Sequence, residues 1–124
     1  ANKLMGRLLN HLIEDVELHI AEINGGVKSN AIPREIDVVA QVSKENISTL
    51  EAKLKEWDGI FKNELRAVDP EVFVKLEVEE QAPARVFDKA SMDRLISCIV
   101  MLPNGIQSMS MEIEDLVESS TNLG

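Results

Sequence analysis

The chain has 124 residues, enough for one domain with its own hydrophobic core and too few for two ordinary domains. Hydrophobic residues make up 44%, which excludes a disordered chain, and the net charge of −9 argues against nucleic acid or anionic membranes as partners. The single cysteine, Cys98, permits no internal disulfide and fits a reducing compartment, so a cytoplasmic location is expected.

The first segment, residues 1–15, has apolar residues at helical spacing and predicts one amphipathic helix. Its apolar face consists of Leu4, Met5, Leu8, Leu9, Leu12 and Ile13.

Two alternating segments follow, and each predicts a half-buried strand. Residues 16–23 place Val16, Leu18 and Ile20 on one face, and Gly25-Gly26 ends the segment. Residues 31–42 resume the alternation, with Pro33 marking an edge or bulge at the strand entrance. The inward residues of this second strand are Ile36, Val38, Ala40 and Val42.

A second helix is expected from Ser43, a plausible N-cap, to the Asp69-Pro70 step that stops it. Its apolar stripe is Ile47, Leu50, Leu54, Trp57, Phe61, Leu65 and Val68. Residues 72–80 then alternate between apolar and charged side chains and predict a third strand.

Asp88 is placed to cap a third helix that runs to Pro103, with Phe87 and Met92 spaced as a hydrophobic staple. Asn104-Gly105 predicts a turn, and residues 105–111 predict a short fourth strand.

The predicted order is therefore α-β-β-α-β-α-β. Strands with one apolar and one polar face favour an antiparallel sheet covered by helices on one side. The sequence predicts an α+β fold, a ferredoxin-like two-layer sandwich with a four-stranded antiparallel sheet.

The residues show no metal-binding motif. His11 and His19 fall on different elements, and no Cys pair or His-Glu-x-x-His spacing is present. We expect His11 on a helix surface and His19 on the polar face of a strand, where either could instead line a contact surface.

The sequence also contains no motif that predicts a catalytic nucleophile. Cys98 falls in an apolar helix and is expected to be a small core residue, and no Gly-rich phosphate loop or Gly-x-Ser-x-Gly elbow is present. The alternating Met109 and Met111 indicate core or interface. We therefore expect no catalytic residue and no metal ligand in this chain.

One segment has two interpretations. Residues 25–35, GGVKSNAIPRE, can be an ordinary hairpin connection, since Gly, Asn and Pro suit turns. Alternatively, Asn30 and Arg34 project hydrogen-bond donors from a rigid sheet end. An Asn amide can donate to a carbonyl oxygen, and Arg can hold a carboxylate.

Both ends lack the usual signals of a natural start and stop. Residue 1 falls within the helical pattern without an N-cap, and the sequence EDLVESSTNLG closes soon after an apolar pair. We expect a segment of a longer chain.

Three stretches together resemble the bacterial aminoacyl-histidine dipeptidases, also called Xaa-His dipeptidases, cytosolic non-specific dipeptidases or peptidase D. These enzymes belong to the zinc aminoacylase/carboxypeptidase/dipeptidase superfamily. The stretches are the opening ANKLMGRLL, the central NGGVKSNAIPRE and the closing LPNGIQSMSMEIEDLVESSTNLG. The resemblance covers essentially the whole chain but only one part of such enzymes, the lid or dimerisation domain.

The resemblance implies that a separate catalytic domain, absent here, binds zinc and hydrolyses the dipeptide. The lid closes over the substrate, and the Asn of its Asn-x-Ile-Pro motif corresponds to Asn30. Arg34 follows the motif and is a weaker candidate for substrate binding. The family's lid histidine would precede residue 1, so neither His11 nor His19 takes its role.

Under this interpretation residues 1–111 are the lid/dimerisation domain, and residues 112–124 return to the catalytic domain. The implied partners are that domain, a second copy of the chain and a dipeptide, without nucleic acid or membrane. Two alternatives remain: a free-standing ferredoxin-like regulatory module that binds a small ligand in the GGVKSN turn, and a structural interaction domain whose turn binds nothing.

Overall fold

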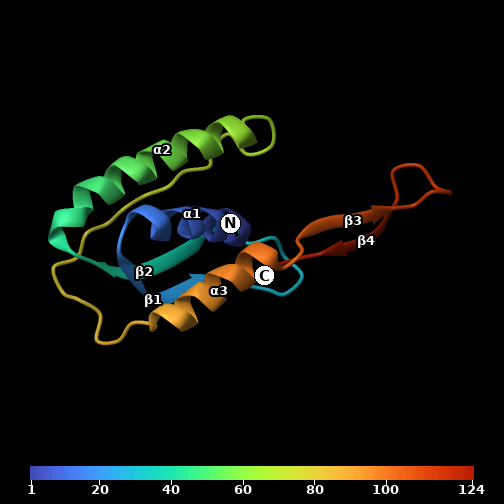
Figure 1. The fold of residues 1–124 in the computed structure, drawn as a ribbon. Helices are drawn as coiled ribbons and strands as arrows, with labels where there is room; N and C mark the ends of the chain where they lie inside the picture. The colour runs from blue at the N-terminus through green and yellow to red at the C-terminus, as the bar shows by residue number, and fades with distance from the viewer.

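Three helices and a two-stranded sheet form the body of the molecule, and a second hairpin projects from it (Figure 1). The computed structural model describes all of residues 1–124. In chain order the elements are α1 (Asn2–Asp15), β1 (Leu18–Gly25), β2 (Ile36–Val42), a 3-10 turn (Lys44–Asn46), α2 (Ile47–Leu65), α3 (Lys89–Met101), β3 (Gly105–Met109) and β4 (Val117–Thr121).

The core lies between the three helices and the inward face of β1. Its 11 buried residues are Leu8, Leu9, Leu12, Val16, Leu18, Ile20, Leu50, Trp57, Phe61, Met92 and Ile96. The predicted first helix and the inward residues of the first strand are thus confirmed. Gly6 lets α1 approach α3 closely, because a Cβ at this position would lie 2.5 Å from Ile99 Cγ2.

β1 and β2 form an antiparallel hairpin that runs in register from Leu18 opposite Val42 to Gly25 opposite Ile36, with a bulge at the Ile20/Glu22 step. The second strand begins at Ile36, later than the predicted residue 31. Ala40 was expected to face inward but is exposed. β2 pairs only with β1, so a small side chain near its open edge stays accessible to water.

α1 and α2 are joined at the surface by Arg7, whose guanidinium donates two hydrogen bonds to the Glu64 carboxylate at 2.8 and 3.0 Å. The same guanidinium lies over the rings of Trp57 and Phe61. α2 ends at Leu65, so Val68, predicted in its apolar stripe, is instead 79% exposed.

The prediction of a third sheet strand at residues 72–80 is wrong. The segment keeps the expected alternation, since Val72, Val74 and Leu76 are half-buried against the core. However, no strand pairs with it, and the Val74 N–H donates instead to Asp58 in α2 at 2.9 Å. The hydrogen bond from Lys62, followed by that from Val74, lowers the pKa of the Asp58 carboxyl.

The predicted α+β class is confirmed, but the single four-stranded sheet is not found. Two separate two-stranded sheets are present, β1-β2 and β3-β4. The predicted strand at 105–111 forms as β3, and its partner is β4, for which residues 117–121 had given no recognised strand pattern. The pairing is therefore local and leaves the first sheet with two strands.

α3 begins as predicted, because the Asp88 carboxylate accepts a hydrogen bond from the Ser91 N–H at 2.9 Å. The expectation that Cys98 is a core residue is wrong, because Cys98 lies on the outer side of α3 and is exposed. Met109 and Met111 were expected in the core or at an interface. They are 44% and 100% exposed, which excludes the core and leaves the interface as a prediction. None of the helices has the length and apolar composition required to cross a membrane.

Candidate functional site

The loop between β1 and β2, residues 26–35, carries both substrate-binding candidates. It leaves β1 at Gly26, whose φ of +86° is a conformation that favours glycine, and Pro33 anchors it by being buried. Asn30 and Arg34 are both exposed, and neither side chain makes a hydrogen bond or ion pair within the chain. Their donors are therefore available to a ligand.

The loop backbone is held by the side chain of Asn122. The Asn122 Nδ2 donates to the carbonyl oxygen of Ala31 at 2.7 Å and to that of Ser29 at 3.2 Å. These two carbonyls belong to the residues immediately before and after Asn30. One carboxamide thus fixes the backbone on both sides of the candidate residue.

Two further asparagines hold the end of the chain against the body. The Leu123 N–H donates to Asn104 Oδ1 at 2.9 Å, and Asn2 Nδ2 donates to the Leu123 carbonyl at 3.1 Å. We refer to Asn2, Asn104 and Asn122 as the asparagine clamp. It joins the start of α1, the turn before β3 and the residues after β4 to the 26–35 loop.

Lys3 brings the end of α3 to the same place. Its ammonium donates to the carbonyls of Ile99, Val100 and Leu102 at 3.0, 2.6 and 2.8 Å. These carbonyls lie at the end of α3, where the helix dipole favours a positive charge. α1 and α3 are thereby fixed relative to the Asn104 turn.

The backbone segments at the clamp approach closely, and glycine makes this contact feasible. A Cβ on Gly26 would lie 2.8 Å from the carbonyl carbon of Gly124, and a Cβ on Gly25 would lie 2.5 Å from Asn2 Oδ1. Asn2 Oδ1 is the one buried side-chain oxygen or nitrogen without a hydrogen-bond partner. Close packing at the two glycines and the hydrogen bonds of the clamp therefore both restrict the position of the loop.

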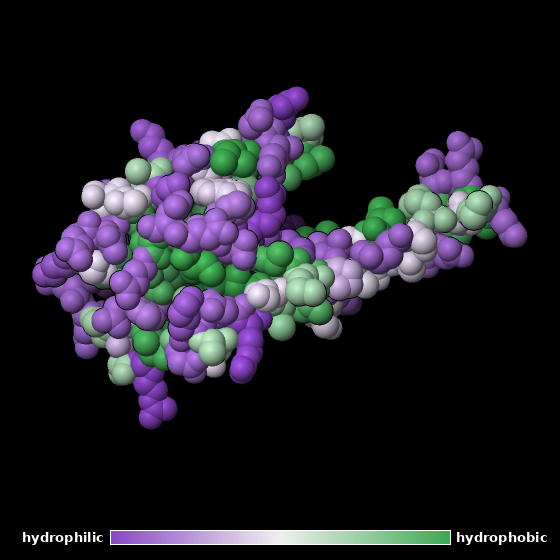
Figure 2. Space-filling view, viewed as in Figure 1, coloured by the Kyte–Doolittle hydropathy of each residue, from purple (hydrophilic) through white to green (hydrophobic).

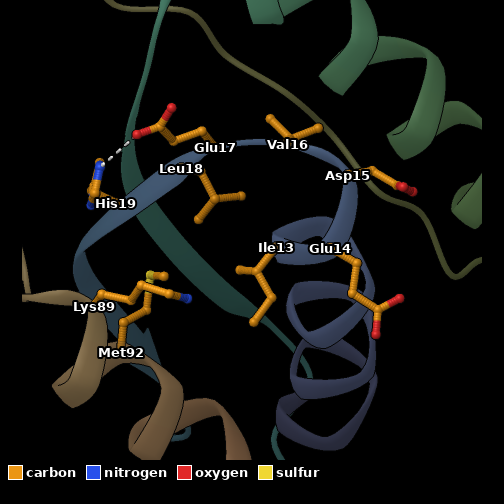
Figure 3. Close-up of a pocket in the computed structure, with 9 residues that line it drawn as sticks. All are labelled: Ile13, Glu14, Asp15, Val16, Glu17, Leu18, His19, Lys89 and Met92. Carbon is orange, nitrogen blue, oxygen red and sulfur yellow. Dashed lines mark ion pairs between the residues drawn. The ribbon is translucent and has the colours of Figure 1, made fainter.

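The two histidines lie apart from this loop. His11 is on the surface of α1 as predicted, where its ring contacts that of Trp57 at 4.9 Å between centroids. His19 lies beside an open hollow lined by the end of α1, the start of β1 and the start of α3 (Figure 3). Its Nε2 is 3.8 Å from Glu17 Oε1, and both side chains are largely exposed.

The side chains do not fit a zinc site. No group of three or more His, Cys, Asp or Glu residues lies close enough to hold a metal ion. Each histidine has only one carboxylate nearby, Glu14 for His11 and Glu17 for His19. We assign no metal-dependent step to this chain.

The sequence predicted the loop as a candidate site but did not predict the side chains that hold it in place. Asn104 was interpreted as a turn residue, and Asn122 and Asn2 were given no role. The bonds of Asn2 and Asn122 join residues 91 to 121 positions apart in the chain, and the bond of Asn104 joins residues 19 positions apart, so no local spacing could indicate these bonds. The only available signal was the closing stretch that ends in Asn122 and Leu123.

The geometry defines an α+β domain that holds one loop rigidly and leaves its polar side chains exposed. The chain belongs to the peptidase dimerisation domain family, whose sequence profile matches residues 1–69.

Two longer proteins are similar to the whole chain. The cytosol non-specific dipeptidase of Escherichia coli (strain K12) is 32% identical over 124 residues. A crystal structure of aminoacylhistidine dipeptidase from Vibrio alginolyticus superposes with a TM-score of 0.93 and 35% identity, over 100% of this chain. The chain spans about a quarter of the length of each of these proteins, 25% in both comparisons.

Two glycines should respond oppositely to replacement by alanine, because Gly26 is closely packed at positive φ and Gly59 is in an open position on a helix. Gly26→Ala should lower the free energy of unfolding by roughly 1–2 kcal/mol, because an L-residue is strained at positive φ. Gly59→Ala should raise it by roughly 0.5–1 kcal/mol, because Gly59 lies within α2 with no atom near the added Cβ. Urea unfolding of the chain measures both. A Gly26→Ala variant as stable as the parent would contradict the packing described.

Proposed function

We propose that this chain is the lid/dimerisation domain of a zinc-dependent dipeptidase that hydrolyses Xaa-His and other dipeptides. The observation that carries the proposal is the rigidly held 26–35 loop, which leaves the donors of Asn30 and Arg34 without partners inside the chain. The names of the two similar proteins, a cytosol non-specific dipeptidase and an aminoacylhistidine dipeptidase, support the substrate class.

In this proposal Asn30 donates a hydrogen bond to the substrate's carbonyl oxygen as that oxygen gains charge during hydrolysis. A donor held in advance at that position stabilises the transition state more than the ground state. Arg34 is the candidate for the substrate carboxylate, which a guanidinium can hold through two parallel bonds. Lys28 adds positive charge to the same loop in a chain whose net charge is −9.

The chemical step belongs to a separate catalytic domain in this proposal. That domain would hold the zinc ions, and this chain alone would hydrolyse nothing. Residues 112–124 would lead back to it after the lid domain of residues 1–111. The boundary falls at the tip of the β3-β4 hairpin, where the chain reverses direction. A cytoplasmic location for the whole protein fits the name of the Escherichia coli relative, a cytosol non-specific dipeptidase.

We also propose that the domain pairs with a second copy through the β3-β4 hairpin. The hairpin projects from the body and carries exposed apolar side chains along its length (Figures 1 and 2). Exposed apolar side chains gathered on one element often mark a protein–protein interface. These side chains are Ile106, Met109, Met111, Ile113, Leu116 and Val117.

Replacing Asn30 tests the substrate role. Asn30→Ala in the full-length protein should lower kcat/KM for a dipeptide by roughly 10²–10³-fold, the usual loss on removing an oxyanion donor. The control is Asn24→Ala, which removes an exposed amide from β1 that makes no side-chain hydrogen bond. Equal activity of the Asn30→Ala variant and the parent would rule out the donor role.

Replacing two methionines tests the pairing surface. The double variant Met109→Ser, Met111→Ser should be monomeric at concentrations where the parent is dimeric, because it removes apolar area from the hairpin. Light scattering during size-exclusion chromatography measures the mass. Val68→Ser, which changes a 79% exposed residue remote from the hairpin, should leave the mass unchanged. A double variant that stays dimeric would place the interface elsewhere.

A further inference from the structure

The side chain of Asn122 is bonded to the loop that carries Asn30, so it can affect substrate binding as well as stability. We infer that Asn122 is a positioning residue for substrate binding, because it fixes the backbone on both sides of Asn30. The inference rests on the proposed role of Asn30. Under this inference, the end of the chain holds the substrate-binding loop in position.

The hydrogen-bond pattern is specific to a carboxamide. An asparagine amide nitrogen carries two hydrogens, and Asn122 uses them on two acceptors, the carbonyls of Ser29 and Ala31. The Ser29 carbonyl belongs to the peptide unit that enters Asn30, and the Ala31 carbonyl belongs to the unit that leaves Ala31. The Ala31 N–H, in the unit between them, donates to the Lys28 carbonyl, so the three bonds together restrict the direction of the Asn30 Cα–Cβ bond.

The loop has little else to hold its tip. Within the loop, one backbone bond closes the turn, from Ala31 N–H to the Lys28 carbonyl at 3.2 Å. The Ala1 nitrogen donates to the Pro33 carbonyl at 2.8 Å, which fixes the end of the loop near β2. Val27 and Ile32 are 88% and 81% exposed, so apolar packing does not hold the tip. Gly124 lies close to Lys28 and Ser29, and Asn122 makes the only side-chain hydrogen bonds to the loop backbone.

Asn122 is itself held firmly. It directly follows β4, where Thr121 pairs with Gly105 of β3. The next residue, Leu123, is bonded through its N–H to Asn104 and through its carbonyl to Asn2. The restraint on Asn30 is thus anchored in β4, α1 and the turn after α3.

Two substitutions at Asn122 test whether this residue positions Asn30 or only stabilises the fold. Asn122→Asp keeps the shape but has no donor, and places carboxylate oxygens against two carbonyl oxygens. Asn122→Ala removes the donors without adding charge. In the full-length protein, both variants should lower kcat/KM by roughly 10–10²-fold, because a displacement of about 1 Å at a reacting group has effects of that order.

The decisive comparison is a double-mutant cycle. If Asn122 acts through Asn30, then Asn122→Ala should have almost no further effect on kcat/KM in an Asn30→Ala background. The charge control is Asn63→Asp, at an exposed position on α2 where the aspartate can still accept the bond from Arg66. It should retain parental activity. An equal loss in both backgrounds would overturn the positioning role.

Hydrogen exchange supplies a readout that does not depend on activity. The Ala31 amide, whose N–H donates to the Lys28 carbonyl, should exchange faster in both Asn122 variants, while the amides of α2 should be unchanged. Unchanged exchange in the loop would overturn the inference even if activity fell. If Asn30→Ala retains full activity while the loop is loosened by Asn122→Ala, the proposed role of Asn30 fails and the clamp itself stands. Should Asn122→Ala not fold, Asn122→Ser, which retains one donor, takes its place in each comparison.

Discussion

The carboxamide of Asn122 joins the end of the chain to a loop that lies 91 to 93 residues earlier in the sequence. Through Asn122 and Leu123, the end of the chain is bonded to the 26–35 loop, to Asn2 at the start of α1 and to Asn104. A hydrogen bond requires a defined distance and direction between donor and acceptor, so these bonds restrict the geometry more than apolar contacts do. The position of the loop therefore depends on the end of the chain.

The parts that the sequence predicted correctly are those that local chemistry determines. α1 and α3 follow from apolar spacing, and the start of α3 follows from the Asp88 side chain that caps it. β1 follows from the alternation of Val16, Leu18 and Ile20, all buried. The position of Asn30 in the loop after β1 was also predictable, because Gly25-Gly26 ends the strand. Gly26 has a positive φ, a conformation that favours glycine.

The parts that the sequence did not predict depend on distant partners. Residues 72–76 alternate between half-buried and exposed, as a strand would. Alternation specifies a face and not a neighbour, and no strand pairs with this segment. β4 has few apolar residues and forms because β3 is available to pair with it. Cys98 lies on the solvent side of an apolar helix, which helical periodicity over a short apolar run does not resolve. The asparagine clamp likewise joins residues that no local pattern relates.

These features describe a domain that holds one exposed loop in place, and in the proposed function that loop presents polar groups to the substrate. The core and the Arg7–Glu64 pair hold the helices, the clamp holds the loop, and the loop leaves Asn30 and Arg34 free. The hairpin begins after Asn104, which belongs to the asparagine clamp. The clamp therefore holds both the base of the proposed pairing surface and the proposed substrate loop.

The most direct test of this account is a crystal structure of the full-length protein with a non-hydrolysable dipeptide analogue bound. The account predicts that Asn30 Nδ2 lies within hydrogen-bond distance of the analogue's carbonyl oxygen, about 3 Å, with Asn122 still bonded to the carbonyls of Ser29 and Ala31. A complex in which Asn30 faces solvent, or in which Asn122 has released the loop, would contradict it.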